Sequence, residues 1–90
     1  MSATLIVRHT VADYAAWRKV YDSAGALHAM HGCKAQPVLR APDNPNDLVI
    51  IHTFPSAADA QAFLAEPALK ETMAKAGIVG QPRVELLVSA

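Results

Sequence analysis

Several kinds of residue and motif are scarce or missing in this sequence, and each absence excludes a class of protein. Cys33 is the one cysteine among 90 residues, so an internal disulfide is impossible and a reducing compartment is favoured. Eight basic residues balance eight acidic ones without any basic run, which argues against nucleic acid and anionic membranes as partners. No segment approaches the roughly 18 apolar residues of a membrane span, and no secretory signal is recognisable. We therefore expect a cytoplasmic protein with no nucleic acid and no membrane partner.

Common catalytic and metal-binding motifs are also missing. The sequence has no P-loop, G-x-G-x-x-G, H-E-x-x-H or G-x-S-x-G, which argues against the enzyme classes that these motifs mark. His28 and His31 are three residues apart, a spacing that permits a shared metal, but no third ligand stands near them. A helix C-terminus favours cationic side chains without any further function. We therefore expect no metal site.

Alanine, by contrast, is abundant. Hydrophobic residues make up 52% of the chain, but 18 of them are alanines, which bury little area each. A chain of this length hides only about 60–65% of its unfolded surface. We expect one domain over residues 1–90 that gains further burial by self-association.

The spacing of apolar and turn-forming residues predicts alternating strands and helices. A first strand at 3–11 places Ala3, Leu5, Val7 and His9 on an apolar face that packs on helices. Either a Thr10–Asp13 capping box or Asp13 alone starts a helix near residues 11–14, and Gly32 ends it. The later elements are a strand at 33–41 with Pro37 at an edge or bulge, a turn at 42–47, a central strand at 48–54, helices opening at Ser56 and Pro67, and a strand at 81–89.

This order, βαββαβ, predicts a ferredoxin-like α+β fold with a four-stranded antiparallel sheet and two helices on one face. The other face then needs a cover, and two sheets packed face to face in a homodimer provide the simplest one. Candidates for this second face include Thr4, Ile6, Val38 and Ile51.

His9 and His52 are the candidate catalytic residues. We expect the first and third strands to be adjacent and parallel, with both histidines towards their C-terminal ends. If His52 and Phe54 also face the helices, the two imidazoles share one pocket. A neutral imidazole there takes a proton from an acidic C–H or phenol, while a protonated one steadies the oxyanion. The alternative is that each histidine is a strand-end residue bonded to a backbone carbonyl or to solvent.

Aromatic residues on the first helix supply candidate ligand contacts. Tyr14, Trp17 and Tyr21 recur at helical spacing and would form a flat apolar wall, although the same spacing is typical of core residues. Arg8 and Arg40 lie on predicted strands, where each binds an acidic ligand group or, as we favour, pairs across a dimer interface. The predicted ligand-binding set is Tyr14, Trp17, Tyr21, Phe54 and Arg40.

Several stretches together resemble a known family. They are VRHTV followed by ADYAAW, the turn APDNPND, the strand VIIHTF with its cap, and the ending EPALKETMAKAGIVGQPRVELL. Over nearly the whole chain the sequence resembles the dimeric α/β-barrel proteins, and more closely the bacterial members known as antibiotic-biosynthesis-monooxygenase-like or cyclase-like. The resemblance implies a homodimer with a cavity between sheet and helices in each subunit.

The resemblance also implies chemistry that needs no cofactor, namely oxygenation or cyclisation of aromatic polyketides. By this analogy His9 and His52 form an acid–base pair, with Tyr14 or Tyr21 orienting the substrate, and Trp17 and Arg40 are candidates for the monooxygenase type. The haem-degrading branch fits less well, because it uses Trp and His on the second helix, where this chain has neither. The rival hypotheses are a non-catalytic dimeric module that binds a hydrophobic ligand or a protein, and a cavity filled by its own side chains.

Overall fold

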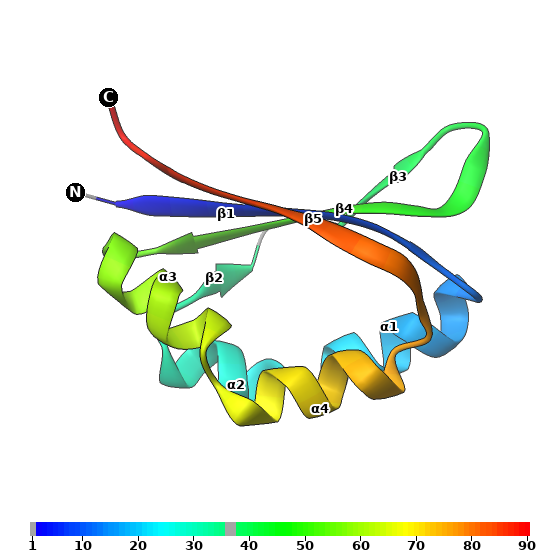
Figure 1. Ribbon diagram of the computed structural model, residues 1–90, viewed down its shortest axis with the longest axis horizontal. Coiled ribbons are helices and arrows are strands. Elements are labelled where there is room, and N and C mark those ends of the chain that lie inside the picture. The colour runs from blue at the N-terminus through cyan, green and yellow to red at the C-terminus, as the bar shows by residue number, and fades with distance from the viewer. Residues whose placement is uncertain (1, 36–37) are drawn as a thin grey trace.

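The computed structural model describes residues 2–35 and 38–90, and it has the predicted ferredoxin-like architecture. One layer is a β-sheet, and the helices of the other layer all lie against the same face of it (Figure 1). The strand order is β2-β4-β1-β5, with β3 also paired to β4. The strands are β1 (Ala3–Val11), β2 (Lys34–Ala35), β3 (Leu39–Ala41), β4 (Asn44–Phe54) and β5 (Ile78–Val88), and the helices are α1 (Tyr14–Ser23), α2 (Gly25–Met30), α3 (Ala57–Leu64) and α4 (Pro67–Lys75).

Strand β1 has the predicted apolar face. Its buried residues alternate from Ala3 and Leu5 to His9 and Val11, because successive side chains of a strand point to opposite faces. Leu5 stands opposite His52 on β4 and opposite Leu86 on β5, so these residues share the face covered by the helices. His52, whose face the sequence leaves open, therefore lies on the side of the sheet that the helices cover.

The expected parallel pairing of the first and third strands is wrong. β1 and β4 are antiparallel, with Leu5 opposite His52 and His9 opposite Leu48. The C-terminal ends of two neighbouring antiparallel strands point in opposite directions, so the two histidines do not meet. Four residues of strand separate them lengthwise, which amounts to about 13 Å at about 3.3 Å per residue. They share a face of the sheet but occupy different ends of it.

The strand predicted at 33–41 consists of two short strands, β2 and β3, which both pair with β4. Residues 36–37, and with them the predicted edge or bulge at Pro37, lie outside the described residues. The turn predicted at 42–47 is shorter, because Ala41 pairs with Asn44 and only Pro42 and Asp43 remain between the strands. β4 therefore starts four residues earlier than expected, and its first part forms a hairpin with β3 that bends away from the helical layer (Figure 1).

The helix predicted between Asp13 and Gly32 is divided in two. Asp13 alone is the N-cap, because its side chain accepts a hydrogen bond from the backbone N–H of Ala16. α1 ends before Ala24, and α2 begins at Gly25. Glycine has a low helix propensity, which favours a break at this position. Gly32 has φ +70° and follows the C-cap of α2, as predicted for a terminating glycine.

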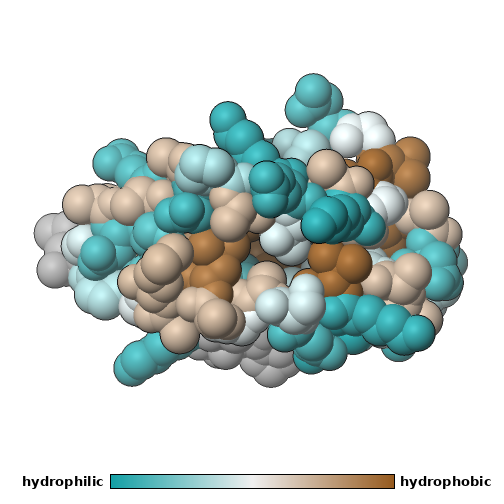
Figure 2. Space-filling view, turned by 90° about the horizontal axis from the view of Figure 1, so that it is seen from below, coloured by the Kyte–Doolittle hydropathy of each residue, from teal (hydrophilic) through white to brown (hydrophobic). Residues whose placement is uncertain are grey.

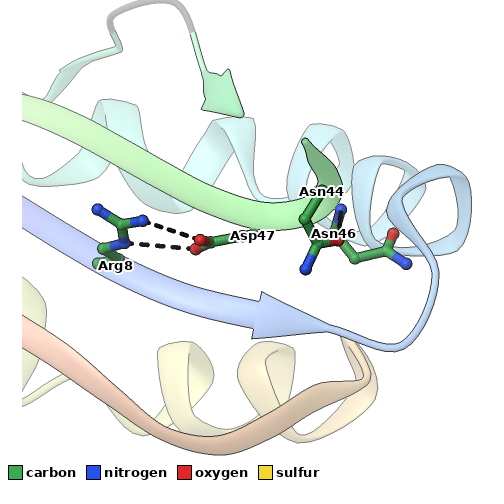
Figure 3. Close-up of polar contacts among 4 residues, drawn as sticks. All are labelled: Arg8, Asn44, Asn46 and Asp47. Carbon is green, nitrogen blue, oxygen red and sulfur yellow. Dashed lines mark hydrogen bonds and ion pairs between the residues drawn. The ribbon is translucent and has the colours of Figure 1, made fainter. Parts of the chain in front are cut away.

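A side-chain contact ties the start of α1 to the sheet. The backbone N–H of Tyr14 donates to Oδ1 of Asn46 at 3.0 Å, and Asn44 in turn accepts from the backbone N–H of Asn46. Asn44 and Asn46 both come from the first part of β4 (Figure 3). This contact satisfies one of the free N–H groups at the helix N-terminus and sets where α1 lies over the sheet.

β5 pairs irregularly with β1 beside His9. Arg8 stands opposite Arg83 and Thr10 opposite Val79, so three residues of β5 face the single residue His9. Gly80 lies in this bulge with φ +75°. Bulges bend a strand locally and occur next to functional sites. The bulge, together with the early start of β5 at Ile78, makes this edge of the sheet differ from the regular strand predicted at 81–89.

The helices are short. Within residues 2–35 and 38–90, none of them combines the length and the apolar composition needed to cross a bilayer.

Candidate functional site

A cavity of about 240 Å3 lies between the sheet and the helices. On the helical side of the molecule, apolar residues are visible among polar ones in the middle of the face (Figure 2). The cavity lining comes from most elements of the fold and is largely apolar; it consists of Leu5, Val7, His9, Trp17, Val20, Tyr21, Ala24, His28, Ile50, His52, Phe63, Leu64, Leu69, Lys70, Thr72, Met73, Ala76, Ile78 and Val84. The largely apolar lining makes the polar groups of the wall stand out, and three of them are imidazoles.

One end of the lining, the His9 end, consists of His9 and Trp17. The two ring centroids are 5.8 Å apart in an edge-on arrangement, and both side chains are buried. Neither ring nitrogen of His9 has a hydrogen-bond partner among the described residues, although both nitrogens are buried. Such unsatisfied polar atoms are rare in folded proteins, where they mark strain, a functional site or an absent water molecule or ligand.

The other end, the His52 end, consists of Tyr21, His28 and His52. The Tyr21 hydroxyl and Nε2 of His52 are 3.1 Å apart, within hydrogen-bond distance. The ring centroids of His28 and His52 are 4.7 Å apart, and those of Tyr21 and His28 are 5.4 Å apart. Phe63 lies against both imidazoles, with ring centroids within 5.8 Å of each. Three groups that can carry or share protons therefore meet within an apolar wall.

The stacked rings of α1 connect the two ends. Trp17 lies nearly parallel to Tyr21 with a centroid separation of 4.8 Å, and Tyr14 stacks on the other side of Trp17 at 5.9 Å. Trp17 and Tyr21 line the cavity, as predicted for a flat aromatic wall, and Trp17 also belongs to the core. The two interpretations of this helix, cavity wall and core, hold together.

Burial sets the protonation of the imidazoles. It lowers the pKa of His9 and of His28, and burial together with the neighbouring His28 lowers the pKa of His52 to about 4. All three imidazoles are therefore neutral at pH 7, which makes them proton acceptors rather than cations. Burial raises the pKa of the Tyr21 hydroxyl, which keeps its proton. The predicted roles of one neutral and one protonated imidazole during the reaction stay predictions.

Three of the predicted ligand-binding residues are not among the described residues that line the cavity: Tyr14, Arg40 and Phe54. The Arg40 guanidinium carbon is 4.5 Å from the ring centroid of Tyr14, a cation–π contact between β3 and α1. Phe54 is fully buried in the core cluster beside the cavity. Their roles in binding stay predictions.

His28 is the functional candidate that sequence reasoning missed, since it was considered only with His31 as a metal pair. His31 instead bonds Glu66 at 3.1 Å, and no cluster suited to a metal occurs in the described part of the chain. The spacing of Tyr21 and His28, seven residues or two helical turns, is a signal that they share a face. This spacing alone does not show that His52, on a distant strand, lies against the same face.

Comparisons with known proteins agree with the fold. The pattern of the antibiotic biosynthesis monooxygenase family matches residues 11–75, and no curated protein matches the chain. SnoaB, a cofactor-independent oxygenase from Streptomyces nogalater, is 21% identical with a TM-score of 0.81, over 99% of this chain and 93% of that one. Rv0793 from Mycobacterium tuberculosis is 18% identical with a TM-score of 0.76, over 100% and 96%. A protein from Caulobacter crescentus is 17% identical with a TM-score of 0.80, over 99% and 90%.

Proposed function

Because the chain belongs to the antibiotic biosynthesis monooxygenase family, we propose that it is a small cofactor-independent enzyme that acts on an aromatic or polyketide-like small molecule by histidine acid–base chemistry. The observation that carries this proposal is the apolar cavity with three buried, neutral imidazoles in its wall. SnoaB, which has a similar fold, is described as a cofactor-independent oxygenase, and this supports the same general class of reaction.

The chemistry begins with removal of a proton. A neutral imidazole accepts a proton from an acidic C–H or a phenol of the ligand, and the electron pair of the broken bond stays on the ligand as an enolate or phenolate. A nearby hydrogen-bond donor stabilises the negative oxygen. Such an anion is the reactive species both for ring closure and for reaction with oxygen, so the proposal includes cyclase-like and monooxygenase-like outcomes.

The size of the cavity limits the ligand. A cavity of roughly 150 Å3 takes up benzene, and this one has about 240 Å3, which suits two fused rings. His9 and His52 are separated lengthwise by about 13 Å of strand, so a ligand of this size has its reacting atom at one end of the cavity. The two predicted catalytic histidines therefore act at different ends rather than as one pair on one atom.

The open face of the sheet supports a homodimer as part of the proposal. Ile6 and Ile51 stand opposite each other there, and Leu39 and Leu87 are about half exposed on the same face. The Arg8–Asp47 ion pair lies among them at 2.8 Å, satisfied within the chain (Figure 3). Apolar side chains around an internally paired charge suit burial against a second copy.

A non-catalytic module that binds a hydrophobic ligand is the second candidate. The observation in its favour is that both nitrogens of His9 and Nδ1 of His52 are closed off by neighbouring atoms. Under this alternative the ligand binds against the aromatic wall, and no proton is transferred.

Two probes separate these candidates. Fluorescence titration with 1-naphthol measures binding of a fused-ring phenol, and deuterium exchange at C1 of 2-tetralone, followed by NMR, measures catalysed proton removal from an acidic C–H. We expect saturable binding and enzyme-dependent exchange. His9→Asn and His52→Asn test the two ends, and His31→Gln is the matched control, because His31 pairs with Glu66 outside the described lining.

If His9 or His52 is itself the base, exchange falls by about 100-fold or more in that variant, as expected for loss of an acid–base group. A partial loss in His52→Asn alone indicates that the base is a neighbouring group at the His52 end. Wild-type exchange in both variants contradicts the assignment to these histidines. Binding of 1-naphthol without any catalysed exchange favours the non-catalytic module.

A further inference from the structure

The ring nitrogens of the three cavity imidazoles differ in what they contact. Both nitrogens of His9 and Nδ1 of His52 are buried without a partner among the described residues, and Nε2 of His52 is bonded to the Tyr21 hydroxyl. The nitrogens of His28 make no hydrogen bond within the described residues, yet they are not among the buried unpartnered atoms. His28 also lines the cavity, and its nitrogens are outside the set of closed-off, unpartnered atoms. His28 is therefore the remaining imidazole of the wall that can present a nitrogen to a ligand.

The hydrogen bond between Tyr21 and His52 has a preferred direction. If the Tyr21 hydroxyl donated to Nε2, the neutral ring would carry its proton on Nδ1, which would be a buried donor without a partner in the described structure. If Nε2–H donates to the hydroxyl oxygen, Nδ1 is left as an unpaired acceptor, which proteins tolerate better than an unpaired donor. In this second tautomer the Tyr21 O–H proton is free to donate to a ligand.

We propose that His28 is the catalytic base at the His52 end, and that the Tyr21 hydroxyl, oriented by His52, is the donor that stabilises the resulting oxyanion. This inference rests on the proposed function. The ring centroids of Tyr21 and His28 are 5.4 Å apart and both residues line the cavity, so both border the same part of it. The ligand class is a fused-ring ketone or phenol with an acidic hydrogen next to the oxygen-bearing carbon.

Each step balances within these residues. A nitrogen of His28 takes the proton from the C–H bond, whose electron pair forms the enolate, and the Tyr21 O–H donates a hydrogen bond to the enolate oxygen. Return of a proton or deuteron from the same nitrogen to carbon regenerates the ketone and the neutral imidazole. In this scheme His52 is a positioning residue, because it acts through Tyr21 and does not contact the reacting atoms.

The first test needs no substrate. Diethyl pyrocarbonate transfers its carbethoxy group to accessible neutral imidazole nitrogens, and mass spectrometry of the digested protein shows which histidines react. We expect His28 to react at least 10-fold faster than His9 and His52, and 1-naphthol to protect His28 while leaving His31 unaffected. Reaction of His52 or His9 at the rate of His28 or faster overturns the assignment.

The second test uses deuterium exchange of 2-tetralone in the intact protein. We expect His28→Gln to lower kcat by 100-fold or more while the Kd of 1-naphthol changes only a few-fold, and Tyr21→Phe to lower kcat by about 10-fold. His52→Gln keeps an amide donor for Tyr21 and should retain more exchange than His52→Leu, whereas His31→Gln should match the wild type.

These outcomes separate the inference from the function on which it rests. Wild-type exchange in His28→Gln, or equal exchange in His52→Gln and His52→Leu, overturns the roles given to these residues while an enzyme remains. Absence of exchange in the wild-type protein overturns the proposed function and the catalytic role of His28 together, and the carbethoxylation rates then decide only whether His28 is the accessible imidazole.

Discussion

The two ends of the cavity use the same kind of residue but hold it differently. At the His9 end, the imidazole lies against the edge of Trp17, and both of its nitrogens are without a partner in the described structure. At the His52 end, the imidazole is bonded to Tyr21 and lies 4.7 Å from the ring centroid of a second imidazole, His28. The first histidine is isolated, and the second belongs to a small polar network.

This difference separates the effect of burial alone on a histidine from the effect of burial within a hydrogen-bonded network. Burial lowers the pKa of both histidines, but the neighbouring imidazole adds to the effect only at the His52 end, where the pKa reaches about 4. A network also fixes tautomers, and a fixed tautomer tells which proton is available to a ligand. The His52 end is therefore the better-organised site for acid–base chemistry, whereas the His9 end is an apolar wall with one unsatisfied polar group.

Among the substitutions considered, we expect Trp17→Ala to have the largest effect on stability, because Trp17 contacts both ends of the cavity. Trp17 is 3% exposed and stacks on Tyr21 while its edge meets His9. We expect Trp17→Ala to lower the free energy of unfolding by about 3–5 kcal/mol, because it leaves a cavity in the core. Urea denaturation followed by circular dichroism measures this. A loss below about 1 kcal/mol would show that the aromatic row does not join the two ends.

Acid should destabilise the protein mainly through the His52 end. The pKa of His52 is about 4 in the folded protein and about 6.5 in an unfolded chain, so the unfolded chain binds more protons between these values. The contribution is fully present above about pH 6.5 and is lost as the pH falls towards 4, with a total of about 3 kcal/mol. The lowered pKa values of His9 and His28 act in the same direction.

Urea unfolding at several pH values between 4 and 7 measures this slope. We expect His52→Gln to flatten it markedly, since glutamine does not titrate, and His31→Gln to leave it nearly unchanged. Equal slopes in the wild type and His52→Gln would contradict a buried neutral imidazole at this position.

The smallest effect is also the one that distinguishes the two ends by its sign. His9→Phe replaces two unsatisfied nitrogens by carbon atoms of similar shape, and we expect stability to be unchanged or to rise by about 1 kcal/mol. His52→Phe removes the partner of the Tyr21 hydroxyl, and we expect a loss of about 1–2 kcal/mol. Thermal denaturation of the two variants under the same conditions compares them. Shifts of the same sign and size would mean that the two ends do not differ as described.

Much of the fold follows from local patterns that the sequence displays. The alternation in β1 and the caps at Asp13 and Ser56 depend on neighbours within a few residues, and the sequence predicts them with the right faces and starts. The pairing direction of β1 and β4 follows instead from the order of the elements along the chain. The predicted antiparallel sheet agrees with it, whereas the expected parallel pairing of these two strands is wrong. That error placed His9 and His52 together when the register separates them.

The site was harder to predict than the fold. Part of the cavity lining could be predicted, because period-two and helical spacing indicate which face of an element is buried. The predicted residues that line the cavity are His9, Trp17, Tyr21 and His52. His28 was missed because its approach to His52 depends on contact between α2 and β4, two segments far apart in the sequence. Which nitrogen is bonded and which is free depends on packing between distant segments, so neighbouring residues in the sequence do not indicate it.

We expect the neutral imidazole network at the His52 end to contact the aromatic ligand. The most direct measurement is ¹H–¹⁵N NMR of the histidine side chains at pH 7 during titration with 1-naphthol. We expect neutral rings for His9, His28 and His52, and saturable shifts at His28 and His52 while His31 stays unchanged. A protonated His52 at pH 7, or saturation with 1-naphthol that leaves His28 and His52 unshifted, would contradict this expectation.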